Sequence, residues 1–462
     1  MYVTPFFDVE DIHCPETDEA AKVIADIFWE ESVRATFNVT GDKARILTER
    51  DREDVITSLT RHDIGFHSNT HSRHPTISEY LENSGWTDGV DKVIQEERPG
   101  IAAVRSVFGQ EPSCFMRPGA TFAAQAIHAG GKQGLPFVGS AVAHPRENVF
   151  WYTNTLHFTD VFGMSDQDYA ATDRFEEQLF EFDDFLEDAI RKDRAWVGVF
   201  CGHPVTIRAN EFGDVLNFAE GRMPPEEEWT RPTLKSAAAW DLAKENLRRL
   251  AVFLREKDGV TVEPIDRSRR RFDDRPSQVD RADILDAANR AADDGIVPVT
   301  DSLSPAETLL GFAEFVQSYA RNGVVPDRVT RRSILGPTVE PPTAPGSDVV
   351  YWDGLVDAAD QLLAASGAGS LPARVEAGDV DIGIGRIYVA LAVAIEGIRN
   401  EAPPPNIDLP DEPRYPAIEQ DLEETIPSWL TSWEIHHPNL DPTALVTHAR
   451  LQTWTMAPAD TG

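Results

Sequence analysis

The chain has 462 residues and a formal net charge of −35. Its length exceeds what one compact core usually organises, so we expect two or more domains. The acidic balance excludes a protein that holds nucleic acid through a basic stripe, and the sequence contains no run of roughly 18 apolar residues that would span a membrane.

Acidic residues are spread along the whole chain, and the basic residues are 35 Arg against only 8 Lys. Arg is the cation that pairs carboxylates bidentately. This bias is typical of halophilic proteins, because molar salt screens the repulsion between carboxylates. The three cysteines form no CxxC pair, and the N-terminus reads as a strand instead of a signal peptide. These features indicate a soluble, cytoplasmic protein.

Residues 1–266 alternate short apolar runs with amphipathic stretches. Strands are predicted at 3–9, 34–39, 63–67, 114–116, 137–141, 149–153, 196–200 and 260–262. Helices are predicted at 18–31, around 55–59, and at about 174–192 and 233–257. Alternation of this kind predicts an α/β fold in which helices cover a parallel sheet, either open or closed into a barrel.

Residues 267–281 are rich in Arg, Asp, Pro and Ser, which indicates a charged linker, and we interpret Arg269–Arg271 as a solvated part of it. Residues 282–400 are expected to form a helical repeat region, because Gly323–Val329 matches Gly369–Val375 after an amphipathic helix in each case. Gly295–Pro298 is a degenerate third copy in this interpretation. Residues 401–462 are predicted to be a Pro-rich connector and a C-terminal helical segment.

The residues that suggest chemistry lie at the ends of predicted strands or directly after them: Asp8, Glu10, His67, Arg117 and His203. The carboxyl ends of parallel strands meet at one edge of a sheet, where such folds place their active sites. We therefore expect these side chains to converge.

His67 and His71 are four residues apart, so both imidazoles lie on one face if the segment turns helically. Two neutral nitrogen donors suit a divalent metal. Asp8 and Glu10 point to the same side of a strand, so one can bind the metal while the other accepts a proton. The alternatives are a surface loop that happens to contain histidines, a structural salt bridge for Arg117 and a core histidine for His203.

The series of motifs resembles that of NodB-like polysaccharide deacetylases, carbohydrate esterase family four. The resemblance covers about residues 1–266 and is carried by the paired acids after the first strand, by Ile64-Gly65-Phe66-His67 with His71, by Phe115-Met116-Arg117-Pro118-Gly119, and by Cys201-Gly202-His203-Pro204. It implies an irregular (β/α)7-type barrel that hydrolyses an N- or O-acetyl group on a carbohydrate substrate.

By position, the resemblance implies that Asp8 is the general base, that Arg117 holds this base, and that His203 is the general acid. It also implies that His67 and His71 bind a divalent metal, most simply zinc. The family's adjacent Asp-Asp is replaced here by Asp-x-Glu-Asp, so Glu10 becomes the third ligand and Asp11 the runner-up. Asp160 is a weak candidate for the acid that orients His203.

Two alternatives remain open from the sequence. The same barrel could hydrolyse another C–N amide bond, such as a ureido or cyclic amide, which suits a cytoplasmic protein. Alternatively, it could be an inactive barrel that binds glycans, with the repeats of 282–400 faintly resembling repeats that bind cell-envelope polymers.

Overall fold

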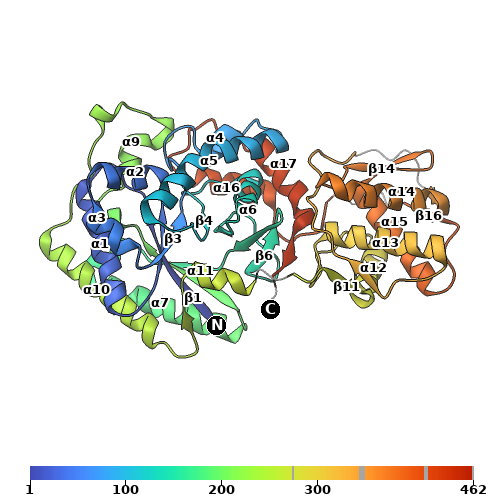
Figure 1. The fold of residues 1–462 in the computed structure, drawn as a ribbon, viewed down its shortest axis with the longest axis horizontal. Coiled ribbons are helices and arrows are strands. Elements are labelled where there is room, and N and C mark those ends of the chain that lie inside the picture. Colours follow the sequence, from blue (N-terminus) through green and yellow to red (C-terminus); the bar gives the residue numbers. More distant parts are fainter. Residues whose placement is uncertain (273–274, 343–348, 410–414, 460–462) are drawn as a thin grey trace.

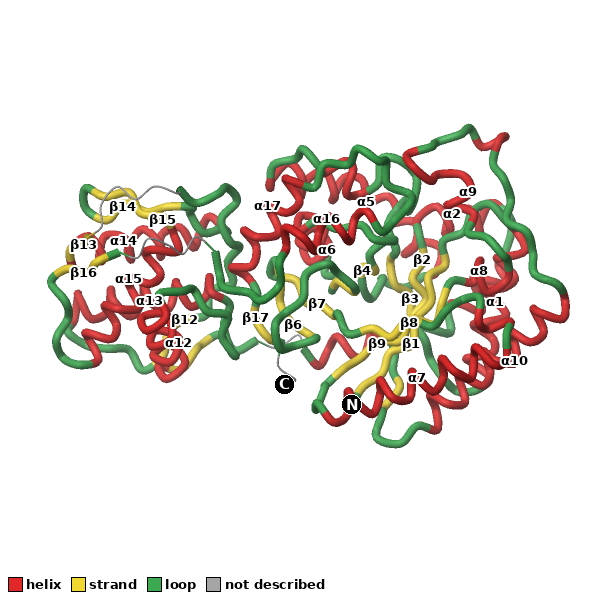
Figure 2. Tube along the Cα trace, turned by 180° about the vertical axis from the view of Figure 1, so that it is seen from behind, coloured by secondary structure: helices red, strands yellow, loops and turns green. Residues whose placement is uncertain are grey.

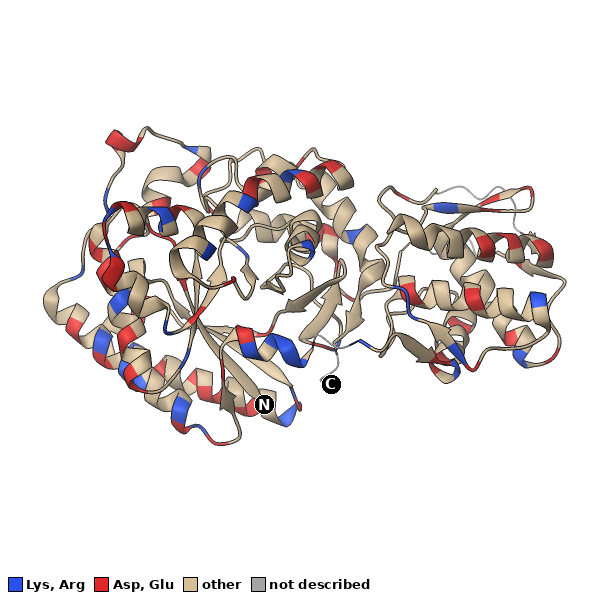
Figure 3. Ribbon diagram, in the orientation of Figure 1, with Lys and Arg blue, Asp and Glu red and all other residues tan. Residues whose placement is uncertain are grey.

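The computed structural model describes residues 1–272, 275–342, 349–409 and 415–459, arranged as a large α/β body and a smaller helix-rich body (Figure 1). In Figure 2 the strands of the large body form one sheet, and the smaller body lies at the end of that sheet which carries β17. Acidic residues are distributed over the helices of both bodies (Figure 3). No helix in the described ranges combines the length and apolar character needed to cross a membrane.

The main sheet has the strand order β17-β6-β7-β5-β4-β3-β2-β1-β9-β8, with β10 paired to the start of β1. Its strands are β1 (Tyr2–Val9), β2 (Thr36–Val39), β3 (Asp63–Phe66), β4 (Phe115–Met116), β5 (Phe137–Val138), β6 (Val149–Tyr152), β7 (Thr155–Phe158), β8 (Val161–Gly163), β9 (Trp196–Gly202), β10 (Thr261–Val262) and β17 (Ala457–Pro458). All neighbours are parallel except the pairs β6–β7 and β6–β17. The predicted α/β architecture is confirmed, as an incomplete barrel in which β8 and β17 are the edges of the described sheet.

Helices cover the large sheet: α1 (Pro15–Glu30), α2 (Gly41–Glu49), α3 (Glu53–Leu59), α4 (Ile77–Leu81), α5 (Trp86–Phe108), α6 (Ala124–Lys132), α7 (Thr172–Arg191), α8 (Pro204–Arg208), α9 (Gly213–Phe218), α10 (Ala237–Glu256) and α11 (Ile265–Ser268). The central strands are buried on both faces, as expected of parallel strands between helix layers. Phe7 of β1, for example, packs edge-on against Phe28 of α1 and stacks on Phe37 of β2. This packing holds the carboxyl end of β1 in place.

The sequence did not reveal strands β7 and β8. Strand β7 follows β6 through Thr153 and Asn154, whose φ angles are 53° and 57°. Two successive left-handed residues make a tight hairpin turn, and this turn lacks the glycine by which such turns are usually recognised.

Residues 267–272 are not a solvated linker, so that expectation was wrong. Arg269 donates hydrogen bonds to the carbonyl oxygens of Ser113 and Gly134. Arg271 pairs with Glu263 at 2.9 Å, and Phe272 is buried in the core. Arg269, Arg271 and Phe272 thus attach this segment to the large body. The rest of the predicted linker includes residues 273–274, which lie outside the described residues.

The smaller body contains α12 (Arg281–Asp294), α13 (Pro305–Asn322), α14 (Trp352–Ala365) and α15 (Ile384–Arg399). Strands β11 (Gln278–Asp280) and β12 (Arg328–Thr330) pair around the first two helices, and β13 (Val349–Tyr351) and β16 (Asn406–Asp408) pair around the other two. Strands β14 (Arg374–Ala377) and β15 (Val380–Gly383) form a further hairpin.

The internal repeat therefore differs from the one predicted. Gly323–Val329 follows the second helix of the first half, whereas Gly369–Val375 follows the first helix of the second half. The repeated unit is strand–helix–helix–strand, and the Gly–Pro motif recurs because both segments end a helix and enter a strand.

The last part of the chain returns to the large body. Helices α16 (Leu422–Thr431) and α17 (Thr443–Gln452) contribute buried side chains to the large core, among them Leu422, Ile426, Leu430 and Leu445, and Met456 beyond α17 adds another. Strand β17 then pairs antiparallel with β6. The sequence had placed 401–462 apart from the first domain; of that range, residues 410–414 and 460–462 lie outside the described residues.

Candidate functional site

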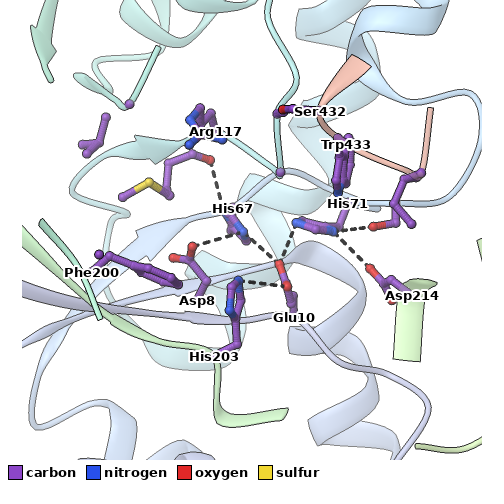
Figure 4. A pocket seen from close by; sticks show the side chains of 18 of the residues that line it. Asp8, Glu10, His67, His71, Arg117, Phe200, His203, Asp214, Ser432 and Trp433 are labelled. Atoms are coloured by element: carbon purple, nitrogen blue, oxygen red, sulfur yellow. Dashed lines mark hydrogen bonds and ion pairs between the residues drawn. The ribbon is translucent and has the colours of Figure 1, made fainter. Parts of the chain in front are cut away.

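One cavity of about 730 Å3 lies at the carboxyl ends of β1, β3, β4 and β9. Every site residue predicted from the sequence lines it: Asp8, Glu10, His67, His71, Arg117 and His203. Figure 4 shows His67, His71 and His203 directed toward Glu10. The expected convergence at the strand ends is therefore present in the structure.

Glu10, His67 and His71 form a buried group whose ligand atoms all lie within 4.8 Å of one another. Glu10 Oε2 is 2.9 Å from His67 Nε2 and 2.6 Å from His71 Nε2. Apart from these contacts with one another, both carboxylate oxygens of Glu10 and Nε2 of His67 are buried without a hydrogen-bond partner among the described residues. Buried polar atoms are normally satisfied, and one carboxylate with two imidazoles is a donor set that Zn2+ accepts, so these residues fit a divalent cation.

The other nitrogen of each imidazole is held by the protein. His67 Nδ1 lies 3.1 Å from the carbonyl oxygen of Met116. His71 Nδ1 lies 3.1 Å from Asp214 Oδ2 and 2.7 Å from Ser72 Oγ. Such partners orient metal-binding histidines and leave Nε2 free for the metal. Asp214 comes from α9, and no motif near it in the sequence indicated this role.

The two histidines meet through a turn, and the segment that joins them is not helical. Ser68 and His71 have φ angles of 71° and 50°, in the left-handed region. The Ser68 hydroxyl accepts a hydrogen bond from the His71 backbone N–H at 3.0 Å, which stabilises the turn. Such strained backbone persists where the surrounding structure holds it, often at functional sites.

The electrostatics of this group favour positive charge. Burial by itself would raise the pKa of Glu10, but the adjacent His71 and His203 bring it well below its usual value. Burial lowers the pKa of His71, and the charge of Glu10 together with Asp214 outweighs this and raises it to about 10. A cation bound here would take the place of the proton that Glu10 and His71 otherwise share.

Asp8 and Asp11 have different surroundings. Asp8 Oδ1 accepts a hydrogen bond from Asn38 Nδ2 at 2.8 Å, and Oδ2 is 3.6 Å from His67 Nε2. Asp11 instead accepts hydrogen bonds from the Cys14 backbone and the Thr17 hydroxyl, at 3.0 and 2.7 Å. Asp11 therefore holds the segment that leads into α1, and Glu10 is the carboxylate that faces the histidines.

Arg117 lies beside the cavity but makes no ion pair with Asp8 within 4.0 Å in the described part of the chain. Its guanidinium group stacks on Trp429, with Cζ 4.5 Å from the ring centre. Burial lowers the pKa of Arg117 to about 10, and the negative charge of Asp8 acts in the opposite direction. The geometry thus gives Arg117 an aromatic partner that the sequence did not indicate.

His203 is held by Asp166, not by Asp160. His203 Nδ1 is 2.8 Å from Asp166 Oδ2, while its Nε2 is 3.5 Å from Glu10 Oε1. Asp160 instead lies 3.6 Å from Arg194, so the prediction that Asp160 orients His203 was wrong. Burial lowers the pKa of His203, and Asp166 followed by Glu10 raises it to about 9.

Residues of the returning C-terminal segment complete the cavity wall: Trp429, Ser432, Trp433, Glu434 and Ile435. Figure 4 shows Trp433 and Ser432 on the opposite side of the site from His203. The Trp433 ring makes an edge contact with His71, at 5.7 Å between ring centres. Sequence reasoning missed these residues because they follow the site motifs by more than 200 positions.

Comparisons with known proteins found similarity among solved structures alone. No family model and no curated protein matches the chain. One similar structure is a mutant carbohydrate esterase family 4 pseudoenzyme with restored enzymatic activity, at 13% identity and a TM-score of 0.31, covering 57% of this chain and 65% of that one. This chain thus spans less than two thirds of that structure.

Two further similar structures come from named bacteria. A family 4 carbohydrate esterase from Streptomyces lividans in complex with acetate is 14% identical, with a TM-score of 0.29 over 54% of this chain and 88% of that one. A peptidoglycan deacetylase from Bacillus subtilis is 12% identical, with a TM-score of 0.29 over 58% of this chain and 90% of that one.

Proposed function

We propose that the large body is a metal-dependent hydrolase that removes an acetyl group from an N- or O-acetylated carbohydrate. The observation that carries this proposal is the buried group of Glu10, His67 and His71, with Asp8 and His203 lining the same cavity. When bound, a divalent cation such as Zn2+ supplies a Lewis acid that polarises the acetyl carbonyl and lowers the pKa of water.

The chain's own side chains provide the proton transfers. Asn38 occupies Oδ1 of Asp8, so Oδ2 is the oxygen that accepts a proton from the attacking water. As the water oxygen bonds to the acetyl carbon, the bond from that carbon to the sugar nitrogen or oxygen breaks. His203, held at Nδ1 by Asp166, donates a proton from Nε2 to this leaving atom.

The first test measures the metal content of the full chain and of His67→Ala. We expect about one equivalent of divalent metal in the wild type and much less in the variant, because one of three protein ligands is lost. A metal-free wild-type protein after growth with added zinc would contradict the proposal.

The second test measures acetate release from oligomers of N-acetylglucosamine. Asp8→Asn removes the proton acceptor, so kcat should fall by about 10²- to 10⁴-fold while the metal stays bound. Asp88→Asn, at an exposed position of α5, is the matched control and should retain activity. Unchanged turnover in Asp8→Asn would show that another group is the base.

A further inference from the structure

Residues 429–440, here called the C-terminal wall, come from the end of the chain but border the candidate site directly. Trp429 and Trp433 line the large cavity beside Arg117 and His71. Trp433 and Glu434 also line a second hollow of about 280 Å3, together with His437, Pro438 and Leu440. The two hollows thus share part of their lining.

The C-terminal wall is fastened to the large body at several points. The backbone N–H groups of Glu220 and Gly221 donate hydrogen bonds to the carbonyl oxygens of Glu434 and Ile435, at 2.7 and 3.1 Å. Glu79 accepts a hydrogen bond from the His437 backbone at 2.9 Å. A wall held by main-chain bonds is preformed, which lowers the entropic cost of binding a ligand.

Trp433 is fixed from its other side by Gly119. A Cβ atom at Gly119 would lie 2.2 Å from the indole ring, so the ring packs against bare backbone. The Trp433 side chain is nevertheless only partly buried, and Ser432 and Glu434 beside it are exposed. An aromatic surface flanked by a hydroxyl and a carboxylate offers an apolar face together with hydrogen-bonding groups.

We propose that the C-terminal wall is the glycan-binding surface of the site. Trp433 packs against the apolar C–H face of the acetylated sugar unit, while Ser432 and Glu434 bind its hydroxyl groups. The neighbouring sugar unit of the glycan occupies the second hollow, between Trp433 and Leu440. This inference rests on the proposed function, and it adds that recognition depends on a segment outside the residues 1–266 that carry the catalytic motifs.

The proposal is tested by measuring how kcat and KM depend on the number of sugar units in the substrate. For full-length protein acting on N-acetylglucosamine oligomers of one to five units, KM should fall as the second unit is added. In Trp433→Ala, KM for the longer oligomers should rise about tenfold or more with a smaller change in kcat, and the benefit of the second unit should shrink. Glu434→Ala, at an exposed position, should raise KM about fivefold without affecting folding.

The controls separate binding from folding. Trp29→Ala removes an exposed tryptophan of α1 and should change neither KM nor metal content. Trp433→Phe keeps an aromatic face and should recover part of the lost affinity. If Trp433→Ala and Glu434→Ala both keep the wild-type KM at every chain length, the proposal is overturned.

A binding measurement separates this proposal from the proposed function. The full chain, stripped of metal by a chelator so that no turnover occurs, is titrated with the N-acetylglucosamine tetramer, and isothermal titration calorimetry measures binding. Loss of tetramer binding in Trp433→Ala supports the binding role of the C-terminal wall, even if the wild type releases no acetate. The absence of acetate release would contradict only the proposed hydrolase activity. The opposite outcome is also distinguishable. If the wild type releases acetate but Trp433→Ala and Glu434→Ala bind the tetramer as tightly as the wild type, the binding role of the C-terminal wall is overturned and the proposed hydrolase stands.

Discussion

At the scale of single residues, Asp214 is the most informative side chain that the sequence did not reveal. Its two oxygens lie 3.1 Å from His13 Nε2 and 3.1 Å from His71 Nδ1. One carboxylate thereby connects a metal-ligand candidate to a second buried histidine. This arrangement fixes which nitrogen of His71 faces Glu10.

Asp214→Asn should therefore weaken metal binding without removing a proposed ligand. Loss of an outer-shell carboxylate typically costs about 10- to 100-fold in metal affinity. Competition with a chromophoric chelator measures this change in the full chain. Asp160→Asn serves as the control, because Asp160 makes no contact with His203 and pairs with Arg194. Equal affinities in the two variants would contradict the orienting role of Asp214.

The buried carboxyl group of Glu97 should make the free energy of unfolding depend on pH. Its side chain is buried and accepts a hydrogen bond from the Asn69 backbone at 2.7 Å. Burial raises its pKa to about 7 from the ordinary glutamate value of 4.5. The folded state therefore binds a proton more tightly than the unfolded state, so the free energy of unfolding falls as pH rises from about 4.5 to 7 and then levels off.

Glu97→Gln keeps an acceptor for Asn69 but cannot titrate. The free energy of unfolding of this variant should therefore not fall over this pH range. In the wild type the fall amounts to up to about 3 kcal/mol for a pKa difference of this size. Urea denaturation at pH 5, 6, 7 and 8 measures the difference between variant and wild type. A gap that stays constant over this range would show that Glu97 does not titrate there.

At the scale of elements, the loop after β4 depends on a helix that is distant in sequence. Gly119 has a φ angle of 48° and packs against Trp433, which follows α16. Gly109 has a φ angle of 63° at the end of α5, with open space around the missing Cβ. The two glycines thus share a backbone conformation but differ in packing.

Gly119→Ala should destabilise the protein more than Gly109→Ala. Both substitutions carry the strain of a left-handed residue, about 1–2 kcal/mol, and Gly119→Ala adds a steric clash of about 1–3 kcal/mol. Urea unfolding compares the two variants, and combining Gly119→Ala with Trp433→Ala should recover part of the loss. Equal losses for the two glycines would show that the indole ring moves aside freely.

At the scale of the whole molecule, the first and last parts of the chain share one core, and the smaller body is inserted between them. A chain that stops after Leu409 lacks β17 and the buried side chains of α16 and α17. Removal of several buried apolar side chains costs about 2–5 kcal/mol each, so the large body should lose its cooperative thermal transition. An unchanged Tm in the truncated chain would show that the C-terminal segment is dispensable.

The net charge of −35 predicts a response to salt. Acidic residues are spread over the helices of both bodies (Figure 3), so the mutual repulsion of their carboxylates opposes the compact state. Because the Debye length falls to about 3 Å at 1 M salt, Tm should rise between 0.1 and 2 M KCl. A Tm that decreases over this range would mean that surface ion pairs contribute more than the repulsion.

Much of the fold of the large body could be predicted from the sequence. The apolar run that became β1 and the amphipathic stretches that became α1, α7 and α10 carry their periodicities locally, and the structure has them within a few residues. The hairpin into β7 and the attachment of Arg269–Phe272 could not be predicted. Both depend on backbone angles or on carbonyl groups that only the folded sheet presents.

The sequence by itself determined the α/β architecture and the set Asp8, Glu10, His67, His71, Arg117 and His203, because these residues lie at or shortly after the ends of apolar strands and parallel strands end at one edge. Only the tertiary structure decided which partners complete the site. Asp166, Asp214 and Trp433 reach it from loops and helices whose approach depends on long-range packing, and local periodicity carries no information about packing between distant segments.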